Sequence, residues 1–205
     1  MLEPHVLVFD FDGTLIDSDP LKWDAFFSVA KDYGLDEKAT FAALSQGGDR
    51  LAIFSRLAAQ ANIGEKSEQM VKSYTDHLER KFLDLPHAPG MPQAILRLRE
   101  NGKKVYLNSA TPLSALKRVL NILNWGSYFD GILGQPKSKS INLQTVLVET
   151  GTEPSDVLVI GNGMDDANSA SKIGCEFVWA NPFDRETGLP PANANRTIID
   201  FSGEF

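Results

Sequence analysis

Residues 6–15 of this 205-residue chain read VLVFDFDGTL, and this stretch decides the fold. Val6–Phe9 is an unbroken apolar run, which is typical of a parallel strand buried on both faces. The run leads directly into Asp10 and Asp12, whose spacing points both side chains the same way in an extended chain. Gly13 then permits a tight turn in which the backbone approaches a ligand. The stretch predicts a buried strand that ends at an acidic site.

The chain repeats this alternation of short apolar runs and helix-like segments. Glycine or proline marks most of the boundaries between them. Such alternation predicts an α/β fold, a doubly wound (Rossmann-like) parallel sheet with helices on both faces. The further predicted strands are residues 105–107, 131–134, 157–160, 177–179 and 197–199, and the predicted helices are residues 92–101, 112–124, 141–149 and 165–173.

The segment from residue 18 to residue 89 differs because it contains no strand pattern. Its apolar residues recur at helical spacing, which predicts helices at 20–33, after Asp36, at 50–61 and at 66–82. We therefore predict an α/β core formed by residues 1–17 and 90–205, with residues 18–89 inserted as a helical cap. Pro86, Pro89 and Gly90 are expected to form the return hinge.

Composition excludes several classes of protein. The formal net charge of −7 disfavours nucleic-acid binding, because phosphate backbones are held by basic faces. The single cysteine cannot form an internal disulfide, and no run approaches the roughly 20 apolar residues that span a bilayer. The expectation is a soluble cytoplasmic protein without a membrane partner. A monomer is compatible with the sequence, which does not settle the oligomeric state.

Polar residues follow four of the apolar runs, at 10–14, 108–111, 135–139 and 161–166. Ligands of open α/β sheets bind beyond the carboxyl ends of the strands, so these clusters are expected to converge. Asp10, Asp12 and Asp166 would then repel one another unless a cation neutralises them, and oxygen ligands suit Mg²⁺. Ser109 and a lysine would add a donor and a positive charge, which favours an anionic substrate.

The run Asp10-Phe11-Asp12-Gly13-Thr14-Leu15 resembles the first motif of the haloacid dehalogenase-like superfamily, most of whose members are phosphatases. Ser109 falls where that superfamily keeps a serine or threonine, and residues 161–166 resemble its fourth motif. The helical segment resembles the inserted cap of the phosphoglycolate phosphatase-like and β-phosphoglucomutase-like branch. The resemblance covers nearly the whole chain.

The resemblance implies a Mg²⁺-dependent phosphatase that hydrolyses a small phosphate monoester. Asp10 would attack phosphorus and form an aspartyl-phosphate intermediate. Asp12 would protonate the leaving oxygen and then activate water. Ser109 and Lys139 would hold the phosphoryl oxygens in place. The dehalogenase branch lacks the second aspartate, so the presence of Asp12 favours phosphoryl transfer.

The same resemblance implies the metal ligands Asp10, the backbone carbonyl of Asp12, Asn162 and Asp166. The fourth motif usually begins with Gly-Asp, whereas this chain has Gly161-Asn162. The amide coordinates through its oxygen but removes one negative charge, so the expected outcome ranges from weaker Mg²⁺ binding to loss of catalysis. The neighbouring Asp165 is a candidate to compensate.

Other assignments leave alternatives open. Lys137 fits the lysine spacing almost as well as Lys139. Arg50 either grips a second anionic group of the substrate or makes a surface contact. The alternative functions are a sugar phosphomutase that uses the same site residues and a non-catalytic protein that binds a phosphate or metabolite. The sequence does not identify the substrate. The predicted substrate-binding residues are Thr14, Arg50, Asn108 and Ala110.

Overall fold

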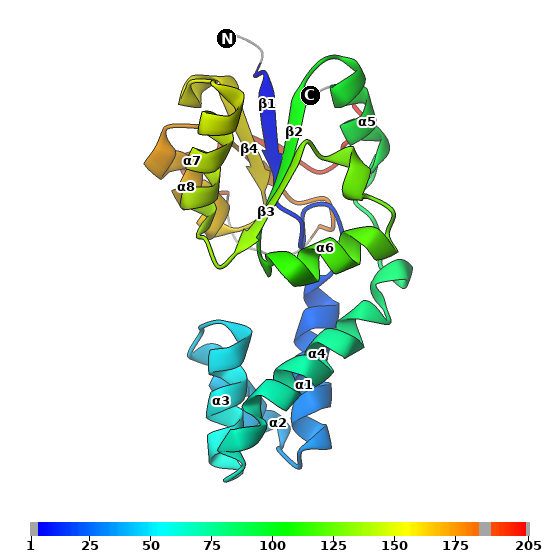
Figure 1. The fold of residues 1–205 in the computed structure, drawn as a ribbon, viewed down its shortest axis with the longest axis vertical. Coiled ribbons are helices and arrows are strands. Elements are labelled where there is room, and N and C mark those ends of the chain that lie inside the picture. The colour runs from blue at the N-terminus through cyan, green and yellow to red at the C-terminus, as the bar shows by residue number, and fades with distance from the viewer. Residues whose placement is uncertain (1–3, 185–189, 204–205) are drawn as a thin grey trace. The chain divides into compact units, whose positions relative to one another are not determined.

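The computed structural model describes residues 4–184 and 190–203. The chain divides into two compact units, one formed by Met1–Asp17 with Leu85–Phe205 and the other by Ser18–Asp84 (Figure 1). The first unit alternates strands and helices, and the second is helical. That the helical unit acts as a cap remains a prediction.

A parallel sheet forms the centre of the α/β unit, with the strand order β3-β2-β1-β4-β5-β6. This order confirms the predicted doubly wound α/β fold, in which ligands bind where the strand order reverses, here between β1 and β4. The paired strands are β1 (Val6–Phe9), β2 (Lys104–Pro112), β3 (Gly131–Gln135), β4 (Val157–Gly161), β5 (Glu176–Ala180) and β6 (Arg196–Ile198).

Helices cover both faces of the sheet, as predicted. Figure 1 shows α7 (Lys139–Thr150) and α8 (Met164–Ile173) on one side, and α5 (Gln93–Glu100) and α6 (Leu113–Ile122) on the other. Short 3₁₀ helices at Gly126–Tyr128 and Pro154–Asp156 precede β3 and β4.

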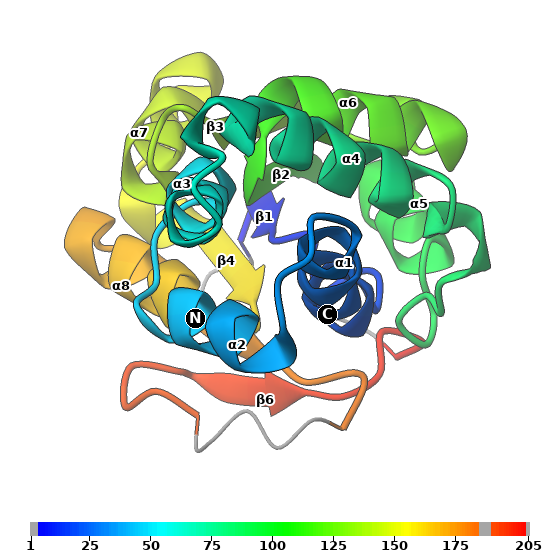
Figure 2. The same ribbon diagram turned by 90° about the horizontal axis from the view of Figure 1, so that it is seen from below.

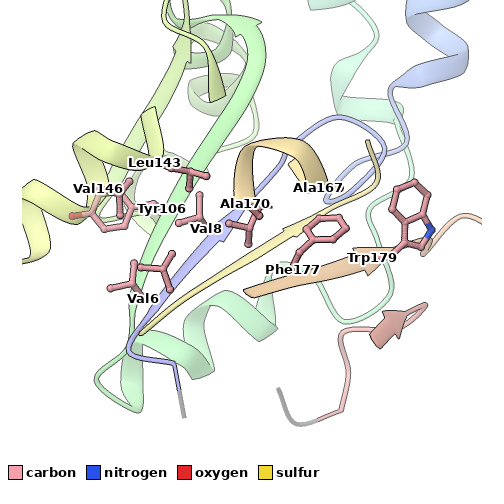
Figure 3. Packing of buried hydrophobic residues seen from close by; sticks show 11 residues of the cluster. Val6, Val8, Tyr106, Leu143, Val146, Ala167, Ala170, Phe177 and Trp179 are labelled. Carbon is pink, nitrogen blue, oxygen red and sulfur yellow. The ribbon is translucent and has the colours of Figure 1, made fainter. Parts of the chain in front are cut away.

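The core beneath α7 and α8 explains why the first strand is apolar throughout. Val6 and Val8 pack there against Leu143 of α7 and Ala167 of α8 (Figure 3). The intervening Leu7 and Phe9 are also fully buried but do not belong to this cluster. Since successive side chains of a strand point to opposite faces, β1 is buried on both sides.

The structure differs from the prediction at Pro112, which was expected in the first turn of a helix. Pro112 is instead the last residue of β2 and the N-cap residue of α6, and its ψ of 132° is not helical. The register explains the difference, because Asn108 pairs with Leu133 and Pro112 with Gln135, so that β2 bulges between them. The polar run 109–111 thus lies within a strand that continues through an irregular stretch.

Residues 85–89 pair with the end of the first motif. The Asp17 N–H donates to the Pro86 carbonyl at 2.9 Å, and the Ala88 N–H donates to the Leu15 carbonyl at 3.0 Å. These contacts place residues 85–89 in the α/β unit, whereas the sequence analysis assigns them to the helical segment.

The segment after β6 packs against residue 89, α5 and β1. Figure 2 shows the chain leaving β6 and reaching α5. The Phe201 N–H donates to the Pro89 carbonyl at 2.9 Å, and Arg97 of α5 donates to the Phe201 carbonyl at 2.9 Å. The Phe201 ring packs against Phe9, with ring centroids 6.2 Å apart.

The helical unit has its own core. It contains α1 (Asp19–Asp32), α2 (Glu37–Ser45), α3 (Arg50–Gln60) and α4 (Ser67–Glu79), with 3₁₀ helices at Gly64–Lys66 and Phe82–Asp84. Phe26, Phe54 and Tyr74 pack together with ring centroids 4.5–5.7 Å apart. Among the residues that the structure describes, no helix is long and apolar enough to cross a membrane.

Replacing Phe201 tests the role of the C-terminal segment. Phe201 is 1% exposed, so Phe201→Ala is expected to lower the free energy of unfolding by about 3–5 kcal/mol in urea denaturation. The control is Ile199→Ala, whose side chain is 67% exposed and should change stability by less than about 0.5 kcal/mol. Equal losses in the two variants would contradict this packing.

Candidate active site

A buried lysine joins two carboxylates at the carboxyl edge of the sheet. Lys139 Nζ lies 2.7 Å from Asp10 Oδ1 and 2.7 Å from Asp166 Oδ1. All three side chains are at most 6% exposed. Asp10 follows β1, Lys139 begins α7 after β3, and Asp166 lies in the first turn of α8 after β4. Three segments far apart in the sequence thus meet at one ammonium group.

Asp12, two residues after Asp10, accepts hydrogen bonds from two hydroxyl groups. Thr111 Oγ1 donates to Asp12 Oδ2 at 2.8 Å, and Ser109 Oγ donates to the same oxygen at 3.3 Å. Both donors belong to the bulged end of β2. The structure thereby brings Asp10, Asp12, Ser109, Lys139 and Asp166 to one edge of the sheet.

The chain between β1 and residue 16 turns sharply, which sets the side chain of Thr14. The Leu15 N–H donates to the Phe11 carbonyl and the Gly13 N–H to the Ile16 carbonyl, both at 2.9 Å. Gly13 has φ 73°, in the left-handed region that favours glycine. Thr14 Oγ1 consequently lies 3.4 Å from Asp10 Oδ2 and 3.3 Å from Asn162 Oδ1.

Two buried asparagines fix the start of α7. Asn108 Nδ2 donates to the Lys139 carbonyl at 3.0 Å, and Asn142 Nδ2 donates to Asn108 Oδ1 at 2.9 Å. These bonds tie β2 to the first turn of the helix that carries the lysine. Lys137, the other candidate, is exposed. The geometry therefore selects Lys139 as the lysine that meets the carboxylates.

The buried cluster of Asp10, Lys139 and Asp166 contains two carboxyl groups and one ammonium group, which shifts the pKa values of Lys139 and Asp166. Burial and the charge of Asp10 raise the pKa of Asp166 to about 7, against the opposing effects of Lys139 and the Gly163 N–H. Burial opposes the charged form of Lys139, but the two carboxylates outweigh it and raise the pKa of the lysine above its ordinary value. One ammonium thus remains charged without fully neutralising the acidic groups around it.

This imbalance fits a hard divalent cation, since the donor atoms are all oxygens. Within residues 4–184 and 190–203, no group of three or more His, Cys, Asp or Glu side chains is arranged to hold a metal ion. The predicted ligand set contains only two such side chains, Asp10 and Asp166, because Asp12 would use its backbone carbonyl and Asn162 its amide oxygen. The residues present therefore remain compatible with Mg²⁺.

Other predicted residues lie differently. Ala110 is exposed on the bulge, and Asp165 is exposed in the first turn of α8, whereas Asp166 is buried. Arg50 begins α3 in the helical unit, with its guanidinium 5.1 Å from the centre of the Tyr74 ring. The side chains of Thr14 and Asn108 hold neighbouring protein groups. Substrate contacts by Thr14, Arg50, Asn108 and Ala110 stay predictions.

Thr111 and Asn142 are site residues that no motif of the sequence pointed to. Thr111 stands two residues after Ser109, the spacing that places two strand side chains on one face, and this signal was available. Asn142 falls within a predicted helix, and its partner Asn108 is 34 positions away. Only the folded arrangement of β2 and α7 shows that these two amides meet.

A family model described as haloacid dehalogenase-like hydrolase matches residues 7–180. A protein named phosphoglycolate phosphatase from Aquifex aeolicus is 28% identical over 86% of this chain and 84% of its own length. A phosphorylated carbohydrates phosphatase from Thermotoga maritima is 24% identical over 85% of this chain and 84% of its own.

Solved structures share the fold. The crystal structure of a predicted phosphoglycolate phosphatase from Haemophilus somnus 129PT superimposes with a TM-score of 0.79, at 18% identity. The match covers 98% of this chain and 96% of that one. At this level of identity, the similarity is evidence for the architecture alone.

Replacing Lys139 tests the electrostatic arrangement without reference to any reaction. Lys139→Met would leave the buried carboxylates of Asp10 and Asp166 without their shared cation, so we expect a loss of about 3–5 kcal/mol in unfolding free energy. Urea denaturation in metal-free buffer near neutral pH measures it. The matched control, Lys137→Met, removes an exposed lysine and should have little effect. Indistinguishable variants would contradict the arrangement.

Proposed function

The chain belongs to the haloacid dehalogenase-like hydrolase family, and on this premise we propose that it is a Mg²⁺-dependent phosphatase. Its substrate is a small phosphate monoester, and the reaction passes through an aspartyl-phosphate intermediate on Asp10. The observation that carries the proposal is the cluster in which Lys139 Nζ lies 2.7 Å from both Asp10 and Asp166. Asp12 follows Asp10 by two residues and accepts hydrogen bonds from the hydroxyls of β2.

Asp10 is the nucleophile in the first step. A carboxylate oxygen attacks phosphorus, and the bond between phosphorus and the ester oxygen breaks. The approach of two anions is unfavourable, and Lys139 offsets this repulsion because its ammonium contacts the attacking carboxylate. Ser109 and Lys139 hold the phosphoryl oxygens during transfer.

Asp12 handles the protons in both steps. It donates a proton to the departing ester oxygen, so that an alcohol leaves. It then accepts a proton from the water that attacks the phosphorus of the intermediate, which breaks the bond to Asp10 and releases phosphate. Asp12 returns to its starting state after one cycle, and the net reaction consumes one water.

The metal site would use the Asp10 and Asp166 carboxylates, the Asp12 carbonyl and the Asn162 amide oxygen. When bound, Mg²⁺ supplies positive charge against the phosphoryl group. Thr14 supports this set from the protein side, because its hydroxyl lies within hydrogen-bond distance of both Asp10 and Asn162.

Two alternatives share this site. A sugar phosphomutase would return the phosphate to another position of the sugar instead of releasing it. A non-catalytic phosphate- or metabolite-binding protein is suggested by Asn162, which lowers the acidic charge of the metal site by one. Arg50 remains the candidate residue to bind a second anionic group of the substrate. The protein is expected to act in the cytoplasm.

Phosphate release from a panel of monoesters tests the proposal. The panel includes phosphoglycolate and sugar phosphates, because relatives carry names of such activities. We expect release that requires Mg²⁺, stops when the metal is chelated and falls at least about a thousandfold in Asp10→Asn, which lacks the nucleophile. A relocated phosphate would indicate a mutase, and binding without turnover would indicate the non-catalytic alternative.

The Asn162→Asp variant tests how the amide sets metal affinity. The substitution is nearly isosteric and adds one negative charge, so Mg²⁺ should bind about tenfold more tightly by calorimetry. The control, Asn121→Asp, makes the same charge change at an exposed position of α6. If both variants bind Mg²⁺ like the wild type, residue 162 is not a ligand.

A further inference from the structure

We propose that Thr111 is a positioning residue, which holds the Asp12 carboxylate in the orientation in which it exchanges protons with the substrate. This inference rests on the proposed function of Asp12 as acid and base. It concerns a residue that the sequence motifs did not single out and that acts through Asp12 rather than on the substrate.

Two hydroxyl groups of β2 lie within hydrogen-bond distance of one oxygen of Asp12. Thr111 Oγ1 donates to Oδ2 at 2.8 Å, and Ser109 Oγ lies 3.3 Å from the same atom. When a carboxyl group is protonated, the oxygen without the proton is the better acceptor. Two hydroxyl donors on Oδ2 therefore disfavour a proton on that oxygen and hold the carboxyl group in one orientation.

Thr111 is the donor that can keep this contact throughout the reaction. A hydroxyl has only one proton to donate. If Ser109 donates to a phosphoryl oxygen, as proposed above, it releases Asp12 at that moment. Thr111 then remains on Oδ2, and its bond is already the shorter of the two.

The bulge of β2 creates this arrangement. Between the pairs Asn108–Leu133 and Pro112–Gln135, β2 advances by four residues while β3 advances by two. The Thr111 N–H also donates to Ser109 Oγ at 3.0 Å, which links the two donors to each other. Bulges re-aim side chains next to active sites, and here both hydroxyls are aimed at Asp12.

Gly134 of β3 makes room for the bulge. A Cβ at this position would lie 2.6 Å from the Thr111 carbonyl oxygen, closer than real Cβ atoms come, and a tight 3.1 Å from Leu113 N. Close approach of the two strands thus depends on the missing side chain. The backbone at Thr111 therefore packs directly against Gly134 of β3.

The chemistry of the leaving group separates positioning from general structural support. An alkyl phosphate must lose an alcohol whose oxygen needs a proton, so its cleavage depends on correctly placed Asp12. p-Nitrophenyl phosphate loses an oxygen that departs as a stable anion and needs little help from an acid. A defect in proton placement therefore lowers kcat/KM for the alkyl ester selectively, because kcat/KM covers the steps up to leaving-group departure.

The test compares Thr111→Val with the wild type on both substrates. We expect kcat/KM for the best alkyl phosphate to fall by about ten- to a hundredfold, and for p-nitrophenyl phosphate by less than about threefold. Thr111→Ser retains the hydroxyl and should restore the alkyl activity to within about threefold of the wild type. The control is Thr145→Val, whose hydroxyl donates to the Ile141 carbonyl within α7.

Other outcomes overturn one proposal or the other. If Thr111→Val lowers kcat/KM equally for both substrates, or if Thr111→Ser does not restore activity, Thr111 is not a positioning residue. If the wild type hydrolyses neither ester, the proposed phosphatase function itself fails. Gly134→Ala gives a second, independent variant, which should show the same selective loss because it displaces the Thr111 backbone.

Discussion

A single buried ammonium group organises the α/β unit around its carboxyl edge. Lys139 contacts Asp10 and Asp166 at equal distances, so β1, α7 and α8 meet through one charge. Burying an ammonium group costs several kcal/mol, and well-placed carboxylates offset this cost. The elements around Lys139 hold its carboxylate partners in such positions. Asn108 and Asn142 hold the first turn of α7, and the sheet order brings β1 and β4 together behind the carboxylates.

The second constraint acts on Asp12 and comes from backbone irregularity. Two hydroxyls of β2 reach one oxygen of Asp12 while this strand pairs with β3 on either side of them. The strand bulges between Asn108 and Pro112, and Gly134 permits the close approach of β3 there. The site therefore contains two separately supported parts, a charged cluster around Asp10 and a hydroxyl cluster around Asp12, and the proposed chemistry assigns attack to the first and proton transfer to the second.

The sequence was most informative where local pattern and tertiary structure agree. The run Val6–Phe9 predicts a doubly buried strand, and the motif after it predicts the family, because both depend on adjacent residues. The predicted strand at 105–107 stops before the bulge at 109–111, because the residues there show no apolar strand pattern. The Asn108–Asn142 contact and the choice of Lys139 over Lys137 depend on which elements meet in space, and spacing along the chain does not determine that.

In the proposed reaction Asp10 carries the phosphoryl group during turnover. The most direct measurement is rapid acid quench of Asp12→Ala with p-nitrophenyl phosphate, followed by mass spectrometry of the peptides. Without Asp12 to activate water, the intermediate should accumulate, and the peptide that contains Asp10 should gain the mass of one phosphoryl group. Release of p-nitrophenol in an amount matching the enzyme, with no phosphoryl group on that peptide, would show that Asp10 is not the nucleophile.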